Sequence, residues 1–270
     1  MYFKRTRCKN CQSSHDEMLE YCPRCGIKNE EHLLFRRTHP MTFVPWYREL
    51  MLFLCGFIGL TLFSLIYTII FKATYEADKD LGNMLINTAS YLTIFVLLLV
   101  IMFPYFRSLI NKFKIPLAYM WAGIGTGALL GFSIIYGIII SFIFPDIGQG
   151  GNQTSASNMV TSFPFISLII IGIIGPICEE LTYRVGLFTL LRRIHPAFAY
   201  IGTAILFGLI HFDFFSSDYL TEFVYLVNYI FAGVCFAFIY EKGGFGASLL
   251  AHISNNVYSV IMILLSTYLV

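Results

Sequence analysis

Apolar stretches about as long as a membrane-crossing helix recur along most of this 270-residue chain. Such a helix needs about 20 predominantly apolar residues to cross a hydrocarbon core ~30 Å thick. The composition agrees, because 57% of the residues are hydrophobic and only 13% are charged, whereas soluble chains average about 25% charged residues. These features exclude a soluble protein and predict an all-α polytopic membrane protein.

The positions of the apolar stretches predict seven membrane spans. They cover residues 50–71, 84–106, 116–144, 163–191, 196–214, 223–240 and 245–270. Residues 146–158, which are rich in Gly, Ser, Asn and Gln, are expected to form a connector on the outer side of the membrane. We therefore divide the chain into a polar module at 1–32, a linker at 33–49 and a transmembrane domain at 50–270.

The N-terminal module contains two Cys-x-x-Cys pairs separated by ten residues. The four cysteines are Cys8, Cys11, Cys22 and Cys25. Each pair turns back tightly enough for two thiolates to reach one ion, which predicts a tetrahedral structural Zn²⁺ site. Two disulfides are the alternative, but a segment without a core of its own is better explained as a ribbon that folds around a metal. A zinc ribbon in turn predicts a reducing, cytoplasmic location.

The distribution of Lys and Arg predicts how the chain lies in the membrane. The linker mixes basic and aromatic side chains, as is typical of a segment at the headgroup layer. With the N-terminus inside, the inner segments hold 15 Lys and Arg, whereas the outer loops hold only Lys72 and Lys79. Loops retained in the cytoplasm keep positive charge. We expect a multi-pass protein of a bacterial plasma membrane, with the N-terminus in the cytoplasm and the C-terminus outside.

The charge balance says little about soluble partners. The formal net charge is only +2, because 18 Lys and Arg are matched by 16 Asp and Glu. No nucleic-acid partner is expected, the lipid bilayer is the expected environment, and the sequence specifies no partner for the ribbon.

Several ionisable or polar residues fall inside the predicted spans, where each costs several kcal/mol unless it is partnered or wet. They are Glu179, Glu180, Arg184, His211, His252 and Asn256. Glu180 and Arg184 have the spacing of an ion pair that holds helices together. That structural explanation leaves Glu179, His211 and His252 without a reason to be there.

Helix geometry predicts that these residues meet. A hairpin that turns at residues 192–195 brings the two glutamates and His211 to the same depth within about one helical turn of 5.4 Å. His252 and Asn256 are four residues apart and project from one face of their helix. We expect a cavity that slopes in from the cytoplasmic side to connect them.

Glycines predict two further features of the bundle. Gly123, Gly127 and Gly131 recur every four residues, a spacing that lets another helix approach closely. Gly175 and Pro176 precede the glutamates by one turn, and we expect them to kink the helix and widen the cavity.

This set of side chains suits the hydrolysis of an amide without a covalent intermediate. Glu179 can deprotonate a water that His211 helps to position. His252 and the amide of Asn256 can stabilise the oxyanion that forms on the carbonyl. Glu180, held by Arg184, would orient the site.

Other chemistries fit the residues less well. A zinc protease needs a His-Glu-x-x-His helix or its inverse, which the sequence lacks, and four cysteines leave no open position on their metal. We therefore expect no cofactor for catalysis. A cysteine enzyme is disfavoured, because Cys178 lies in an apolar, acidic setting that does not activate a thiol. A rhomboid-like serine enzyme is disfavoured, because Ser248 lacks a Gly-x-Ser-x-Gly-like element. A membrane scaffold, immunity protein or transporter with a charged cavity is the main non-enzymatic alternative.

At these residues the sequence resembles a known family. Residues 179–184 match Glu-Glu-x-x-x-Arg, residues 207–211 match Phe-x-x-x-His, and residues 252–256 match His-x-x-x-Asn. In this order on successive apolar helices, they resemble the motifs of the CPBP (CAAX protease and bacteriocin-processing, or Abi) intramembrane glutamic endopeptidases. The resemblance covers about residues 163–270.

The resemblance implies an activity and a role for each residue. By it, Glu179 and His211 activate the water, His252 and Asn256 form the oxyanion site, and Glu180 and Arg184 support them. It implies membrane-associated peptide or protein substrates. In a bacterium, where prenylated CAAX proteins are not expected, it does not imply that such proteins are cleaved. The family's motifs do not require a zinc ribbon.

Overall fold

The computed structural model describes residues 5–16, 22–28 and 41–268. In the N-terminal module, β1 (Arg5–Arg7) and β2 (Ser14–Asp16) form an antiparallel pair in which Thr6 lies opposite His15. Residues 33–40 of the predicted linker lie outside the described residues, as do residues 1–4, 17–21 and 29–32 of the predicted ribbon.

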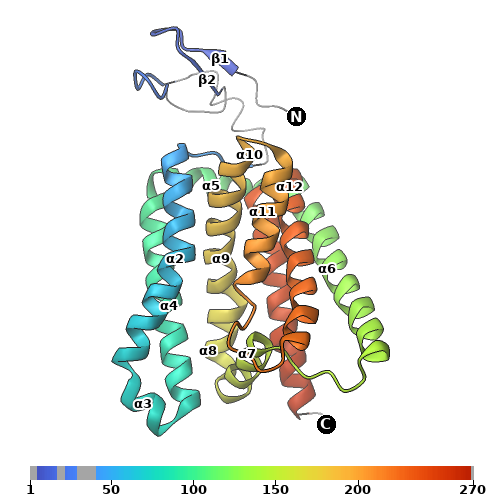
Figure 1. Cartoon of the computed structure of the whole chain (residues 1–270). Helices are drawn as coiled ribbons and strands as arrows, with labels where there is room; N and C mark the ends of the chain where they lie inside the picture. Colours follow the sequence, from blue (N-terminus) through green and yellow to red (C-terminus); the bar gives the residue numbers. More distant parts are fainter. Residues whose placement is uncertain (1–4, 17–21, 29–40, 269–270) are drawn as a thin grey trace.

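Helices make up most of the remaining chain (Figure 1). The first half contains α2 (Trp46–Ile70), α3 (Lys72–Ala77), α4 (Lys79–Met102), the short 3₁₀ helix η1 (Phe103–Tyr105), α5 (Phe106–Lys112), α6 (Pro116–Ile143) and α7 (Gly151–Ser162). The second half contains α8 (Pro164–Ile169), η2 (Ile170–Ile174), α9 (Gly175–Glu179), η3 (Glu180–Phe188), α10 (Thr189–Arg192), α11 (Pro196–Leu209) and α12 (Tyr219–Tyr268). The connector expected at 146–158 is therefore partly helical, because α7 begins inside it.

Five helices in the described part of the chain are long and apolar enough to cross a membrane. They are Trp46–Ile70, Lys79–Lys112, Pro116–Ile143, Pro164–Arg192 and Tyr219–Thr267. The last of these, α12, covers both of the spans predicted at 223–240 and 245–270. It is interrupted between them at Gly244, whose φ of 84° and ψ of −174° are not helical. The span predicted at 196–214 contains only the 14 residues of α11. The all-α membrane class is confirmed, and the count of seven spans stays a prediction.

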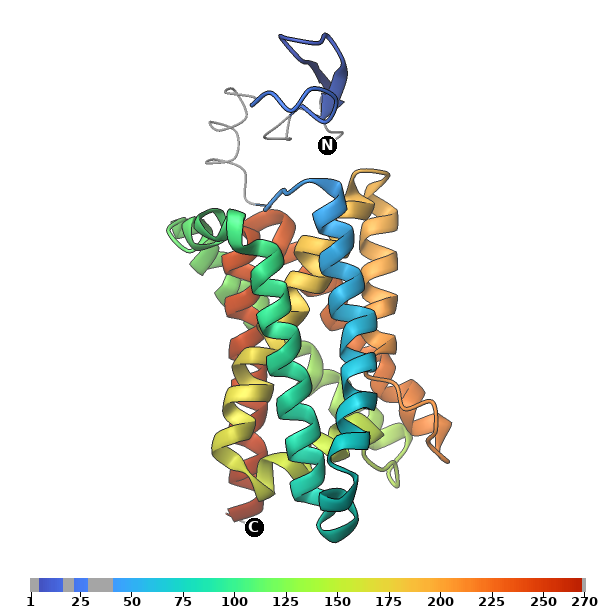
Figure 2. The ribbon, with the colours of Figure 1, turned by 90° about the vertical axis from the view of Figure 1, so that its left-hand side faces the viewer.

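The helix that carries the two glutamates forms the centre of the bundle. The most apolar window of Pro164–Arg192 is 50% buried, compared with 6% for Pro116–Ile143. Its segments contact α2 and α4 on one side and α11 and α12 on the other, as Figures 1 and 2 show. Charged side chains on this helix are therefore shielded from lipid by its neighbours.

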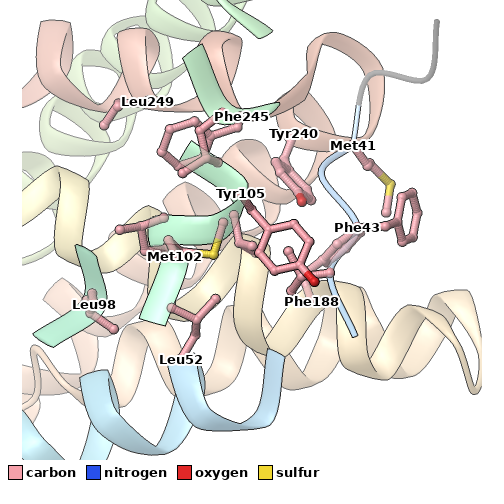
Figure 3. Packing of buried hydrophobic residues seen from close by; sticks show 14 of the residues in the cluster. Met41, Phe43, Leu52, Leu98, Met102, Tyr105, Phe188, Tyr240, Phe245 and Leu249 are labelled. Carbon is pink, nitrogen blue, oxygen red and sulfur yellow. The ribbon is translucent and has the colours of Figure 1, made fainter. Parts of the chain in front are cut away.

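A buried apolar cluster packs α2, α4, η1, η3 and α12 together at the end of the bundle where α2 begins (Figure 3). It includes Phe43, Tyr105, Phe188 and Tyr240. The Tyr240 hydroxyl lies 3.0 Å from both the backbone N–H and the carbonyl of Thr42, so it can accept from one and donate to the other. The segment that precedes α2 is thus fixed to α12.

Two ion pairs hold the same end of the bundle. Arg193 donates two hydrogen bonds of 2.7 Å to the fully buried carboxylate of Glu49 in α2. Arg192 donates bonds of 2.9 and 2.7 Å to Glu241 in α12. The Arg193 pair is bidentate, because its two nitrogens bind different carboxylate oxygens, whereas both Arg192 nitrogens bind one oxygen. Bidentate arginine pairs fix orientation as well as position. The turn between α10 and α11 is therefore tied to the helices on either side of it.

The glycine pattern of α6 acts differently from the prediction. Added Cβ atoms at Gly123, Gly127 and Gly131 would meet nothing within 4 Å, so these glycines do not pack against another helix of this chain. Gly125 does, because a Cβ there would lie 2.1 Å from Cδ1 of Ile239 in α12. The close approach lies on the face of α6 that carries Ala118, Ala122 and Leu129, which are buried.

Candidate active site

The two glutamates lie where the central helix changes its hydrogen-bond pattern. The backbone is π-helical over η2, α-helical over α9 and π-helical again over η3, so that Glu179 ends one segment and Glu180 begins the next. Proline lacks a backbone N–H and cannot complete the helical ladder, and Pro176 lies between the two π segments. Such segments are rare and often mark functional sites. The π segments flank Gly175 and Pro176, and the kink expected there stays a prediction.

Glu180 is fully buried and has three partners. Its Oε1 lies 3.5 Å from Nε of Arg184, which is also fully buried, and 3.0 Å from Nδ1 of His252. The Ser248 hydroxyl donates to its other carboxylate oxygen. Ser248 has no place in the predicted site. The signal that could have found it is its position one turn before His252 on the same helix face.

Arg184 lies in an aromatic cage. Its guanidinium carbon is 5.0 Å from the ring centroid of Phe207 and 5.4 Å from that of Phe236. Among the described residues, none of its three guanidinium nitrogens has a hydrogen-bond partner. The charge is therefore balanced by Glu180 and by the faces of two rings, which attract cations. The predicted ion pair between Glu180 and Arg184 is present.

His252 lies between the two glutamates. Its Nδ1 contacts Glu180, and its Nε2 lies 3.5 Å from Oε2 of Glu179. The ring stacks on Phe236 with centroids 4.2 Å apart and an angle of 22° between the planes. An imidazole can donate to two carboxylates at once only when both ring nitrogens carry protons. Packing against Phe236 holds the ring in place, and each of its two nitrogens faces a carboxylate oxygen.

His211 follows α11 rather than lying within it. The helix ends at Leu209, and the N–H of His211 donates to the carbonyl of Gly208 in a tighter turn. The side-chain Nδ1 lies 2.8 Å from the carbonyl oxygen of Phe207. Because a carbonyl only accepts hydrogen bonds, Nδ1 carries the proton, and Nε2 of the neutral ring is an acceptor. The ring stacks on Tyr229 of α12, with centroids 4.3 Å apart.

Asn256 lies one turn beyond His252, as predicted. Its amide nitrogen donates to the carbonyl of Ile171 in the π-helical segment η2 at 3.0 Å. A carbonyl inside a π turn is less regularly paired than one in an α-helix, and this bond supplies a partner for it. An amide nitrogen has two hydrogens, so Asn256 retains one further donor.

One cavity of about 350 Å³ joins the predicted site residues. Glu179, His211, His252 and Asn256 all contribute to its wall, whereas Glu180 and Arg184 do not. The remaining polar lining consists mainly of amides and hydroxyls, among them Asn87, Ser133, Asn152, Gln153, Asn228 and Ser259. The structure therefore brings four of the six predicted residues around a shared space and places the other two behind them.

The direction of this cavity differs from the prediction. It was expected to slope in from the cytoplasmic side, which the predicted topology places at the end of the bundle where α2 begins. Its described lining instead includes α7 and the first and last turns of α12, and it has no residue from α5 or α10. Figure 1 shows α7 at the end opposite to α5 and α10. The prediction was wrong because it used the depth of His252 alone and treated the α7 segment as a connector.

A second cavity of about 410 Å³ lies on the other side of Glu179. Its lining comes from α2, α4, η3 and α11 and the turn after it, and is mostly apolar, with Phe57, Leu60, Ile94 and Leu206 among its members. Glu179 and Tyr91 line both cavities. The carboxylate therefore stands between a polar space and an apolar space.

The four N-terminal cysteines form a group that could bind a metal. Their sulfur atoms all lie within 4.8 Å of one another. The Cys8 and Cys25 sulfurs are 3.5 Å apart, as are those of Cys11 and Cys22, far longer than the ~2.05 Å of a disulfide bond. All seven cysteines of the chain are free. The disulfide alternative is therefore not what the structure shows.

The two cysteine pairs share one backbone design. In each, the residue after the second cysteine has positive φ, 56° at Gln12 and 70° at Gly26, and its N–H donates to the carbonyl of the first cysteine at 2.9 Å. The Ser13 hydroxyl, 3.3 Å from the Cys22 sulfur, lowers the pKa of that thiol to about 5. Metals bind the thiolate form, and the geometry of the cluster fits a metal.

A segment in the second half of the chain matches a known family. Residues 161–258 match the model of the Rce1-like family, described as type II CAAX prenyl endopeptidase Rce1-like. No solved structure matches the chain.

Two curated bacterial proteins are similar to the chain. An "Uncharacterized protein" of Mycoplasma capricolum subsp. capricolum is 26% identical over 211 residues, which is 72% of this chain and 59% of that protein. The "Putative membrane peptidase YdiL" of Bacillus subtilis is 29% identical over 154 residues, 56% of this chain and 59% of that protein. The chain therefore spans about 59% of the length of these relatives. The resemblance to the CAAX-type membrane endopeptidases is confirmed over residues 161–258, the segment that holds all six residues of the predicted site.

Proposed function

We propose that this chain is an intramembrane endopeptidase that hydrolyses peptide bonds of membrane-associated proteins or peptides, with Glu179 as the general base. The observation that carries the proposal is the cavity that Glu179, His211, His252 and Asn256 line together inside the helical bundle. The family match over the same residues and the similarity to a protein named as a membrane peptidase support it.

The geometry supports a reaction through an activated water. A water in the cavity can donate one hydrogen to the Glu179 carboxylate and the other to Nε2 of His211, because both are acceptors. As the water oxygen bonds to the substrate carbonyl carbon, its proton moves to Glu179 and the carbonyl oxygen becomes an oxyanion. Breaking of the C–N bond then passes that proton from Glu179 to the departing nitrogen.

Donors for the oxyanion come from α12. His252 and Asn256 both line the cavity, where an imidazole N–H and the second amide hydrogen can donate to the oxyanion. Preorganised donors of this kind contribute about 2.7–4 kcal/mol each to transition-state stabilisation. Glu180 and Ser248 position His252 from behind without contact with the substrate, and Arg184 neutralises Glu180. No metal takes part in these steps.

The second cavity supports a membrane-associated substrate. Apolar side chains of α2, α4 and α11 surround it, and Glu179 lies at its boundary with the polar cavity. A substrate with an apolar part in this space would present the adjoining peptide bond to the carboxylate.

We also propose that the cysteine cluster holds Zn²⁺. Four thiolates within reach of one point complete a tetrahedral shell and leave no position for a water, which makes the ion structural. Cys8, Cys11, Cys22 and Cys25 would hold it. A zinc ribbon and the charge bias of the loops together support a cytoplasmic N-terminus at a bacterial plasma membrane.

Substrate trapping tests the proposal. Cells that express Glu179→Gln are compared by membrane proteomics with cells that express the unchanged chain and with cells that express Glu76→Gln. Glu76 is exposed and pairs only with exposed Lys72 within the described residues, so it is the matched control. Uncut membrane proteins should accumulate with Glu179→Gln alone. Identical proteomes for all three, with Glu179→Gln normally folded, would favour a scaffold or transporter.

A further inference from the structure

The two ends of the helical bundle differ in positive charge. Seven described Lys and Arg residues lie at the end where α2 begins, namely Arg48, Arg107, Lys112, Lys114, Arg192, Arg193 and Lys242. The opposite end, which carries α3 and α7, has only Lys72 and Lys79. Because the end that faces the cytoplasm retains Lys and Arg, the α7 end faces away from the cytoplasm.

The cavity that contains Glu179 belongs to the α7 end. Asn87 lies in the half of α4 that is close to α3, and Asn152 and Gln153 lie in the first turn of α7. The lining residues of α12 other than those beside the glutamates come from its first turns, such as Asn228, and its last turns, such as Ser259. Apart from the residues beside the glutamates, the helices that build the cavity thus contribute the halves that lie toward α7.

Hydrogen bonds hold the segments at the α7 end of the cavity in place. Glu222 at the start of α12 is buried and accepts a hydrogen bond of 2.7 Å from the backbone N–H of Gly151 in α7. Its other oxygen accepts a bond of 3.0 Å from the N–H of Asp213. One carboxylate therefore joins α7, the segment after His211 and α12, so that the cavity wall on this side is a built part of the fold.

The lining has no fixed positive charge. Among the described residues around the cavity there is no Lys or Arg, and Glu179 is the only carboxylate. Amides and hydroxyls can hydrogen-bond to a peptide backbone. A free terminal carboxylate would meet no Lys or Arg and would face the charge of Glu179. The lining therefore suits the interior of a peptide chain rather than its C-terminal end.

From the charge asymmetry and the lining together, we infer that the site takes peptide segments presented at the non-cytoplasmic face of the membrane and cuts them internally. The substrate class is thus an exported or membrane-anchored peptide whose cleaved segment lies outside the cytoplasm. This inference rests on the proposed peptidase function for the cleavage, but the side from which the cavity is reached can be measured separately.

Cysteine labelling measures that side without any need for activity. Ser155 is exposed on α7 and lines the cavity, whereas Lys114 is exposed at the opposite end. Ser155→Cys and Lys114→Cys are each compared with the parent chain by the gel shift of one extra membrane-impermeant PEG-maleimide, in intact and in permeabilised spheroplasts. Ser155→Cys should gain the label in intact spheroplasts, and Lys114→Cys only after permeabilisation. The reverse pattern, or equal labelling of both in intact spheroplasts, would overturn the inference.

A blocking experiment links the side of entry to cleavage. Glu76→Cys serves as the control, because residue 76 is exposed at the α7 end but does not line the cavity. PEG-maleimide added to intact spheroplasts should lower processing of a trapped substrate at least tenfold in Ser155→Cys and leave Glu76→Cys unchanged. Equal effects on both labelled variants would overturn this route. If no substrate is processed at all, the peptidase proposal fails while the labelling result still assigns the side of the cavity.

Discussion

The Nε2 atom of His252 lies 3.5 Å from Oε2 of Glu179. The same ring contacts Glu180 through Nδ1, so one imidazole connects the proposed general base to a fully buried ion pair. His211, in contrast, bonds through Nδ1 only to the carbonyl of Phe207, four residues earlier. The two histidines line one cavity, but only His252 is a hydrogen-bond partner of a buried carboxylate.

This difference predicts separate effects for the two histidines. His211→Ala should lower turnover about 10²–10⁴-fold, the range for loss of an acid-base group. It should destabilise the fold less than His252→Ala, because it removes a local hydrogen bond and the stacking on Tyr229 but no partner of a buried carboxylate. His252→Ala should lower turnover and also destabilise the fold by about 1–3 kcal/mol, because it leaves a partner of Glu180 unsatisfied. Processing assays and unfolding in detergent measure the two effects. Equal losses of stability would contradict the assigned roles.

Removal of Arg184 should be among the most destabilising changes in the chain. Arg184→Ala leaves Glu180 as a buried charge without its cation, which costs about 3–5 kcal/mol in comparable pairs. The matched control is Lys72→Ala, which breaks a pair of the same i, i+4 spacing whose side chains are 73% and 66% exposed. That change should leave the unfolding midpoint unaltered, since exposed pairs contribute little.

A double variant separates charge from shape. Glu180→Gln combined with Arg184→Met removes both charges while keeping similar side-chain volumes, and should recover much of the stability lost in Arg184→Ala. Its turnover should stay low, because Gln at position 180 no longer offers a charged acceptor to Nδ1 of His252. Full activity in the double variant would show that the ion pair has no part in positioning.

Much of this arrangement could be predicted from the sequence. Apolar length gave the helical class, and i, i+4 spacing gave the pairing of Glu180 with Arg184 and the shared face of His252 and Asn256. These features depend on the local period of a helix, which can be read from a single sequence. The association of spans followed from the cost of charge in lipid.

The missed features depend on contacts between distant segments. Glu222 accepts hydrogen bonds from the backbone N–H of Gly151, at the start of α7, and from that of Asp213, in the segment after α11. Nothing in the local sequence of α7 indicates that a carboxylate 71 residues later will satisfy its first N–H. The direction of the cavity was wrong for the same reason. The role of Ser248 was missed because its acceptor, Glu180, lies on another helix.

The cysteine cluster should contain one zinc ion per chain in the purified protein. Substitution of Cys22 by Ser should abolish the bound metal, as elemental analysis of the detergent-solubilised chain would show, because three thiolates bind far more weakly than four. Cys55→Ser is the control, since Cys55 lies in α2 away from the cluster. A chelator should remove the metal from the ribbon, and the chain should still hydrolyse its substrate at an unchanged rate. Loss of turnover in proportion to lost metal would contradict a purely structural ion.

The contact between α2 and the central helix gives a prediction at a single methyl group. A Cβ at Gly56 would lie 1.8 Å from Oγ1 of Thr182, which donates to the carbonyl of Cys178 at 2.7 Å beside the glutamates. Gly56→Ala must therefore displace either α2 or the π-helical segment η3. Overpacking of this kind costs about 1–3 kcal/mol, and we expect a loss of turnover as well, because Glu179 lies within one turn of Thr182.

The matched control for Gly56→Ala is Gly127→Ala on the outer face of α6. A Cβ there would meet nothing within 4 Å, and alanine is favoured over glycine in a helix by up to about 1 kcal/mol. The unfolding midpoint in detergent should fall for Gly56→Ala and stay level or rise for Gly127→Ala. Similar midpoints for the two variants would mean that α2 does not pack against Thr182 as closely as the structure describes. The apolar cavity beside Glu179, which both Gly56 and Thr182 line, would then have a different wall.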